Sequence, residues 1–267
     1  MFIDYINKLR ADGRRYFEFD QLVHDLGISV AAAKSGIYRL KKTGFVITPA
    51  KGLYIIVPPE RQPYGCIPAE ELVPILMNFL KCGYYVSLLS AASHYGATHQ
   101  KASSFQVIAN KRLKHNLEFG QVKIDLLYKK SLEKLPIKDI TVSTGYLKIA
   151  TPELVLFDLF MYRHQSGGLN HIATVLSELI ESVNPTRLIA LAKTIREVSW
   201  LQRLGYILEQ LDTMESHKTE ILIEKIAKYL EGKMKFYIPL ASELPKAGFP
   251  YIEKWKIIAN TEIESDI

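Results

Sequence analysis

The chain has 267 residues, a length that favours two domains and can bury a full hydrophobic core without disulfides or metals. Hydrophobic residues make up 48% and charged residues 23% of the sequence, a globular composition that excludes a wholly disordered protein. The two cysteines, Cys66 and Cys82, exclude a disulfide framework and a four-ligand zinc site, so we expect a reducing compartment, the cytoplasm. No apolar run is long enough to predict a membrane span, and we expect no signal peptide.

The formal net charge of +6 is unevenly distributed along the chain. Residues 1–60 hold nine basic and six acidic residues, and residues 61–150 hold twelve against six. Residues 151–267 hold thirteen basic against sixteen acidic residues. The basic excess in residues 1–150 favours a polyanionic partner for that part of the chain, whereas residues 151–267 are acidic. Lysines that merely solvate a surface explain the same pattern.

Apolar spacing predicts helices at the N-terminus. The pattern predicts a first helix over 2–11 and an extended stretch over 16–19. Asp20 is predicted as the N-cap of a second helix, which Gly27 ends. The short turn that follows contains glycine, as a helix-turn-helix requires.

A third helix and a hairpin complete this region. Ser29 is expected to cap a helix that reaches about Thr43 and faces the first two helices with one apolar stripe. Two β-rich runs then flank a loop over 48–52, in which Pro49 is expected to preset the turn. This order predicts an α+β protein whose residues 1–60 form a winged helix-turn-helix, followed by a linker over 61–68.

The third helix presents polar and basic residues opposite its apolar stripe. A helix of this diameter fits the major groove of DNA, where its first turns reach base edges. We expect base contacts from Ser29, Lys34, Ser35 and Tyr38, and phosphate contacts from Arg39, Lys41, Lys42 and the wing residue Lys51. Arg14 and Arg15 are weaker phosphate candidates. The alternative is a protein-binding winged helix with an ordinary basic surface, but basic residues concentrate on the face that the fold leaves free.

The sequence of residues 69–267 predicts a larger domain that begins with both helices and strands and then becomes mostly helical. Its first part is expected to contain helices over 68–81 and 87–95 and strand-like segments over 103–111, 121–128 and 140–149. Thr151 and Asn184, each followed by proline, are predicted helix N-caps. Further helices are predicted over 169–182, 185–196, 198–212 and 217–231, with short terminal strands over 236–240 and 254–259.

A basic segment between two of the predicted strands contains Lys111, Arg112 and Lys114. These residues either add contacts to the DNA backbone or form a solvated rim, and the sequence leaves both readings open.

Catalytic and metal-binding motifs are missing. The histidines and cysteines, including His94 and His99, never take the CxxC or HExxH spacing, and no GxSxG or glycine-rich phosphate loop occurs. Asp125, two residues after Lys123, is similar to the acidic-plus-lysine arrangement of some metal-dependent nucleases, but no second well-spaced carboxylate is evident. We therefore expect no catalytic residue, no metal and no cofactor, and a protein that acts by binding.

Three passages of the sequence resemble the AbiEi family of abortive-infection antitoxins, also described as predicted regulators of viral defence. They are KGLYIIVP at 51–58, YYVSLLSAASHYGA at 84–97 and IATPELVLFDL at 149–159. Their order and the overall length match across nearly the whole chain.

The resemblance implies two functional parts. The winged helix would bind inverted repeats in its own operon promoter as a transcriptional repressor, with one basic face across both domains. The C-terminal domain, residues 69–267, would neutralise a nucleotidyltransferase-like toxin encoded nearby, in antiviral defence. No antitoxic residue is transferred from the family to this sequence.

Two other functions compete with an antitoxin. A one-component regulator would sense a small molecule with its C-terminal domain and would hold a sizeable apolar pocket with a few convergent polar groups. A nuclease centred on Asp125 would cleave nucleic acid with Mg²⁺.

Overall fold

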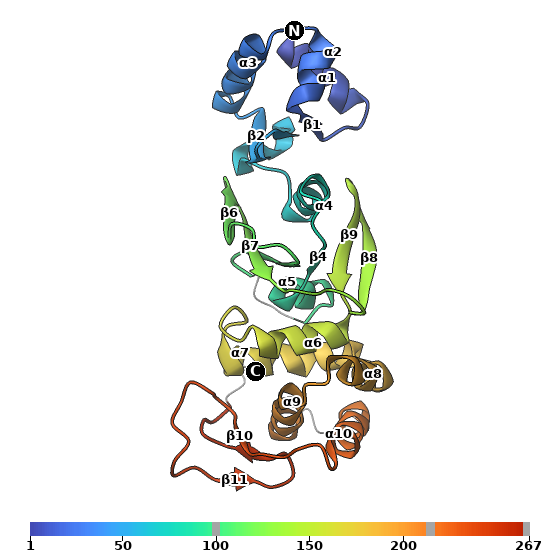
Figure 1. The fold of residues 1–267 in the computed structure, drawn as a ribbon, viewed down its shortest axis with the longest axis vertical. Helices are drawn as coiled ribbons and strands as arrows, with labels where there is room; N and C mark the ends of the chain where they lie inside the picture. Colours follow the sequence, from blue (N-terminus) through green and yellow to red (C-terminus); the bar gives the residue numbers. More distant parts are fainter. Residues whose placement is uncertain (98–101, 212–216, 264–267) are drawn as a thin grey trace. The chain divides into compact units, whose positions relative to one another are not determined.

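The structure is a computed structural model that describes residues 1–97, 102–211 and 217–263 (Figure 1). It is a mixed α+β protein, as predicted. Its contacts divide the chain into two compact units. The first unit comprises residues 1–86, 103–132 and 139–149, and the second unit comprises the rest of the described chain.

The N-terminal part of the first unit contains three helices and a small sheet. The elements are α1 (Phe2–Ala11), β1 (Tyr16–Glu18), α2 (Phe19–Leu26), α3 (Val30–Lys42), β2 (Val46–Ala50) and β3 (Leu53–Ile56). Among the residues described there, the strands form an antiparallel sheet in the order β1-β3-β2. Leu22, Ile37, Leu40 and Phe17 are buried together between the helices and the sheet. The predicted helices and hairpin are therefore present, in the predicted order.

Two local predictions in this region were wrong. Asp20 is not the N-cap of α2, because the helix begins at Phe19 and Glu18 takes the cap position. Asp20 lies instead in the first turn, where its negative charge suits the helix dipole. Pro49 does not form the turn but lies inside β2, an edge strand whose register shifts between Ile47 and Ala50. Proline has no amide hydrogen to donate. An irregular edge strand tolerates it because no hydrogen bond of the sheet is lost there.

Residues after the hairpin pack closely on another part of the first unit. Pro59–Tyr64 forms a 3₁₀ helix, η1. The amide of Gln121 donates to the carbonyl of Tyr64 at 2.8 Å. A Cβ at Gly120 would lie 2.2 Å from that carbonyl oxygen, so only glycine allows the two backbones to approach this closely.

The rest of the first unit is built on one larger sheet. Six strands among the described residues form it in the order β6-β7-β5-β4-β9-β8. They are β4 (Tyr84–Val86), β5 (Phe105–Ala109), β6 (Asn116–Phe119), β7 (Val122–Tyr128), β8 (Ile137–Val142) and β9 (Gly145–Ala150). Helix α4 (Ala69–Phe79) contacts β3 and β7. The predicted strands are present, whereas β4 and β6 were not predicted as strands.

The second unit is mainly helical. Its helices are α5 (Leu88–His94), α6 (Pro152–Met161), α7 (Gly168–Leu179), η2 (Ile180–Ser182), α8 (Pro185–Ile195), α9 (Ser199–Gln210) and α10 (His217–Leu230). The short strands β10 (Ile238–Pro239), β11 (Tyr251–Ile252) and β12 (Ile257–Ile258) pair in the order β10-β12-β11. None of the helices in the described ranges has both the length and the apolar character needed to cross a bilayer.

Helix α6 lies at the centre of this unit. Its residues from Glu153 to Phe160 are all buried, two carboxylates among them. The hydroxyl of Ser87, just before α5, donates to Asp158 at 2.8 Å. The amide of Asn184 donates to Glu153 at 2.9 Å. Buried carboxylates need such partners, so these bonds tie α6 to the start of α5 and of α8.

Candidate nucleic-acid interface

Helix α3 separates its apolar and polar residues cleanly. Its N-cap Ser29 accepts a hydrogen bond from the amide of Ala32 at 3.2 Å, as the sequence predicted. Ala33, Gly36, Ile37 and Leu40 are buried. The glycine allows a close contact, because a Cβ there would lie 2.1 Å from the ring of Phe2 in α1.

The other side of α3 is open to solvent. The residues exposed there are Lys34, Ser35, Tyr38, Arg39, Lys41 and Lys42. Tyr38 is 68% exposed, which is high for an aromatic side chain in a helix. The helical repeat brings positions four apart onto one face, so the sequence spacing alone determines this grouping.

Four of these residues line a shallow depression that is open to solvent. Lys34, Ser35, Tyr38 and Arg39 surround a volume of about 470 Å³. Two cations, a hydroxyl and an aromatic ring therefore converge on one concave patch.

The positive charges on this face of α3 are not neutralised by neighbouring acidic residues. No acidic residue occurs in α3, and in the described ranges no carboxylate forms an ion pair with Lys34, Arg39, Lys41 or Lys42. Such a surface attracts polyanions. Lys51 is exposed in the turn between β2 and β3, and Ser29 is exposed at the start of α3.

The other predicted contacts are placed differently. Arg14 and Arg15 are half-buried, and Arg14 donates to the side chain of Gln21 at 2.8 Å. These two arginines are therefore less accessible than the cations of α3.

The basic segment between β5 and β6 is exposed. The ammonium of Lys111 donates to the carbonyl of Leu80 at 2.9 Å. Arg112 lies over the ring of Tyr128, 4.7 Å from its centre, and Lys114 is exposed. All three cations belong to the first unit.

The candidates for other chemistry are dispersed. In the parts of the chain that the structure describes, no group of three or more histidine, cysteine or carboxylate side chains could hold a metal. Asp125 accepts a hydrogen bond from Ser104, and burial together with the charge of Lys138 lowers the pKa of His94. His99 lies outside the described residues.

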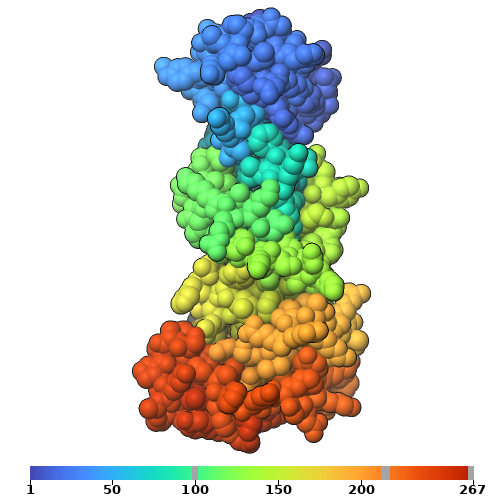
Figure 2. Space-filling view, in the orientation of Figure 1, coloured from blue at the N-terminus to red at the C-terminus, as the bar shows by residue number. Residues whose placement is uncertain are grey.

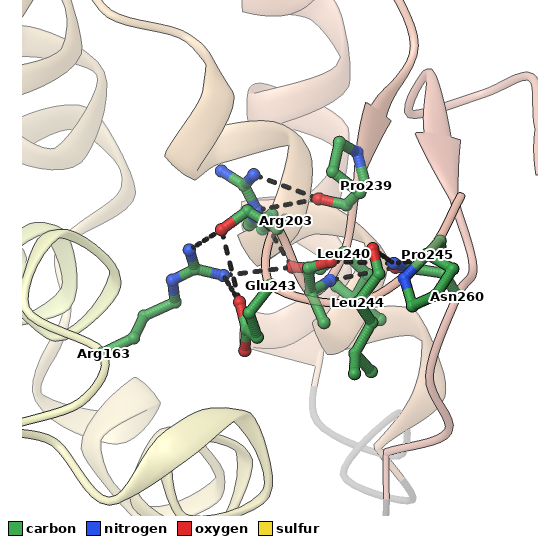
Figure 3. A network of polar contacts seen from close by, with 10 residues as sticks. Arg163, Arg203, Pro239, Leu240, Glu243, Leu244, Pro245 and Asn260 are labelled. Atoms are coloured by element: carbon green, nitrogen blue, oxygen red, sulfur yellow. Dashed lines mark hydrogen bonds and ion pairs between the residues drawn. The ribbon is translucent and has the colours of Figure 1, made fainter.

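Sequence reasoning did not find two features. The depression on α3 was missed because it depends on how side chains diverge from the helix. A network around Arg163 and Arg203 in the second unit (Figure 3) was missed because its carbonyl partners lie 36 to 77 residues away in the sequence.

Comparisons with known proteins give a match to one family domain and a similar fold. Residues 85–210 match the AbiEi antitoxin C-terminal domain. No curated protein matches the chain.

Two solved structures are similar. One is the RV2827C protein from Mycobacterium tuberculosis, at 16% identity and a TM-score of 0.66, over 95% of this chain and 89% of that one. This likeness supports the fold alone. The other is an antigenic nucleotidyltransferase-like protein from Paracoccidioides brasiliensis, at 11% identity over 49% of this chain and 88% of that chain. Its TM-score of 0.30 is too low to support an argument.

The family match runs from β4 to α9 and covers residues 85–97 and 149–159, which belong to two of the three resembling passages. The match assigns residues 85–210 to the AbiEi antitoxin C-terminal domain and supports the resemblance that these passages of the sequence show.

Proposed function

We propose that the chain is a DNA-binding autorepressor and the antitoxin of an abortive-infection toxin–antitoxin system. It acts by binding and not as an enzyme. Its residues 1–60 form a winged helix-turn-helix that binds inverted repeats in its own promoter, and residues 69–267 neutralise a nucleotidyltransferase-like toxin encoded nearby.

The exposed basic face of α3 carries the DNA-binding part of the proposal. Helices α2 and α3 meet at a short turn in which Gly27 has a φ of +59°, and α3 keeps its cations free of carboxylates. The β2–β3 hairpin follows α3 and carries Lys51 in its turn. This order is that of a recognition helix and a wing.

The exposed residues of α3 and the wing divide into those that contact bases and those that contact phosphates. Lys34, Ser35 and Tyr38 line the depression on α3 and face base edges, together with Ser29 at the start of the helix. The cations closer to the end of the helix, with the wing lysine, bind phosphates and set the register; they are Arg39, Lys41, Lys42 and Lys51.

The contacts outside α3 are secondary in this proposal. Arg14 and Arg15 have less accessible side chains, whereas the exposed cations between β5 and β6 reach flanking phosphates; they are Lys111, Arg112 and Lys114.

The family supports the antitoxin part. The matched residues 85–210 extend from the last strand before α5 through α9. Neutralisation therefore belongs to the C-terminal part of the chain, apart from the α3 surface.

A double variant tests DNA binding. Lys34→Ala with Tyr38→Ala removes one cation and one ring from the depression without touching buried residues. It is expected to abolish the electrophoretic shift of the chain's own promoter. Lys8→Ala, which removes an exposed cation from α1, is the matched control and should leave the shift intact. Unchanged affinity in the double variant would show that α3 does not dock on DNA.

Co-expression tests the antitoxin. Expression of the adjacent toxin gene alone should stop growth, and co-expression of the chain should restore it. Growth arrest that persists in the presence of folded chain would refute the antitoxin assignment.

A further inference from the structure

The exposed face of α3 begins with an apolar turn. Val30, the first residue of the helix, is 50% exposed, and Tyr38 further along is 68% exposed. Among the described residues of α3, no other large apolar side chain has this exposure. Ala31 and Ala32 beside Val30 are also exposed. Figure 2 shows the blue N-terminal residues, to which α3 belongs, at the molecular surface. The first turn of α3 therefore presents methyl groups to solvent, whereas the later turns present cations.

Folding gives no reason for a valine at this position. The hydrophobic core of the N-terminal part takes Ile37 and Leu40 from α3, and Val30 is not among the described side chains that pack on that core. Ser29 already caps the helix. A β-branched residue is also less favourable than alanine in a helix, because its side chain loses rotamers there. An exposed Val30 therefore suits a role in binding.

Val30 lies in one row with two residues that the proposed function assigns to base edges. Residues four apart follow one another along the same ridge of a helix, so Val30, Lys34 and Tyr38 form one ridge of α3. Lys34 and Tyr38 also line the depression on this helix. A helix that turns these two side chains toward the major groove turns Val30 toward it as well.

The chemistry of the groove identifies what each of these side chains recognises. Among the base edges in the major groove, thymine alone carries a methyl group, and the other groups there are hydrogen-bond donors and acceptors. The side chain of Val30 has neither donor nor acceptor, so the thymine methyl is its match. The ammonium of Lys34 has donors only, and guanine offers it two acceptors, O6 and N7, on one edge.

We infer that Val30 is a specificity-determining residue that packs on the 5-methyl group of a thymine in the operator, and that Lys34 contacts a guanine close to that thymine. The inference rests on the proposed DNA binding by α3 and adds base identities to it. Four residues of an α-helix rise about 6 Å, and stacked bases are about 3.4 Å apart. The two bases therefore lie within about two base pairs of each other.

A uracil scan tests the thymine contact. Each thymine in one half of the promoter's inverted repeat is replaced in turn by deoxyuridine, which keeps the pairing with adenine and lacks only the 5-methyl group. Binding of the full chain to each duplex is measured by fluorescence anisotropy. Replacement of the contacted thymine is expected to weaken binding about 3- to 5-fold, the effect of losing one buried methyl group.

Val30→Ala completes a double-substitution cycle. This variant should bind the unmodified operator more weakly and show no further loss when the contacted thymine is replaced by deoxyuridine. Its affinity for an unrelated duplex should stay unchanged, because the phosphate contacts remain. Ile3→Ala, which removes a 51% exposed apolar side chain from α1, is the matched control and should keep the full sensitivity to uracil.

A second probe locates the base that Lys34 contacts. Guanines of the same half-site are replaced in turn by 7-deazaguanine, which lacks the N7 acceptor. The contacted guanine should be the one whose replacement weakens binding of the unmodified chain and does not further weaken binding of Lys34→Ala. A position more than about two base pairs from the sensitive thymine would contradict the proposed ridge.

The outcomes separate the inference from the proposed function. Failure of the unmodified chain to bind its promoter would refute both. Promoter binding that no uracil replacement weakens would overturn the inference and leave DNA binding standing. Sensitivity to uracil that persists in Val30→Ala would assign the thymine to another residue and would also overturn it. A changed oligomeric state of Val30→Ala in light scattering, with uracil sensitivity retained, would instead assign Val30 to a contact between copies of the chain.

Discussion

Residues of the same type have different roles according to burial. Arg203 is largely buried, and burial together with the nearby Arg163 lowers its pKa to about 10, which still leaves it charged at neutral pH. It donates to backbone carbonyls and holds a loop. Arg39 is exposed on α3 and pairs with no carboxylate in the described ranges. The count of basic residues in the sequence does not distinguish these roles, because tertiary structure decides which cations stay free.

The free cations of α3 predict a salt dependence. Arg39→Ala with Lys42→Ala removes two proposed phosphate contacts, so affinity should fall by a similar factor for operator and unrelated duplexes. The slope of log affinity against log salt concentration should decrease by about 1.8, since each lost contact releases about 0.9 fewer counterions. Fluorescence anisotropy over a salt series measures both quantities. A slope equal to that of the unmodified chain would place these cations away from DNA.

At the scale of elements, the sequence predicts what local chemistry determines. The cap residues Ser29 and Asn184 and the stop at Gly27 were predicted from residue types alone, and the structure confirms each. The strands β4 and β6 were not predicted, because a three-residue strand is too short to show alternation and β6 carries exposed polar residues. β4 forms by pairing with the distant strands β5 and β9, whereas β6 forms by pairing with β7, which follows it directly in the chain.

The cap of α8 gives a quantitative prediction. The side-chain oxygen of Asn184 accepts from the amides of Thr186 and Arg187 at 3.0 and 3.1 Å. Asn184→Ala should lower the free energy of unfolding by about 1 kcal/mol, because two amides at the helix start lose their partner. Asn184→Asp keeps an acceptor and should cost far less. Denaturant unfolding of the three proteins measures the difference, and equal losses in both variants would contradict the capping role.

A glycine in α9 gives a second quantitative prediction of stability. Ala is normally favoured over Gly inside a helix by about 1 kcal/mol. At Gly205, however, a Cβ would lie 2.3 Å from the ring of Trp255, which is fully buried and donates to Glu209 at 2.6 Å. Gly205→Ala should therefore destabilise the protein by about 1–3 kcal/mol, as overpacking of a core does. Gln210→Ala at the end of the same helix is the control, and a stabilised Gly205→Ala variant would show that the ring moves freely.

At the scale of the whole molecule, prediction from the sequence was uneven. The basic face of α3 was predicted in full, since helical spacing alone places its residues together. The segment 239–245, held by Arg163, Arg203 and Asn260, was not, because carbonyls and donors meet there only after the chain folds. The candidate DNA surface belongs to the first unit and this segment to the second.

The proposed division of tasks between residues 1–60 and residues 69–267 predicts that the two activities separate. Lys34→Ala with Tyr38→Ala should abolish promoter binding and still restore growth against the toxin, because both residues lie outside residues 69–267, to which neutralisation is assigned. A promoter shift and a growth assay on this variant, at protein levels matched to the unmodified chain, measure the two outcomes. If the α3 variant also lost rescue, repression and neutralisation would share one surface, and the assignment of separate tasks to residues 1–60 and 69–267 would be wrong.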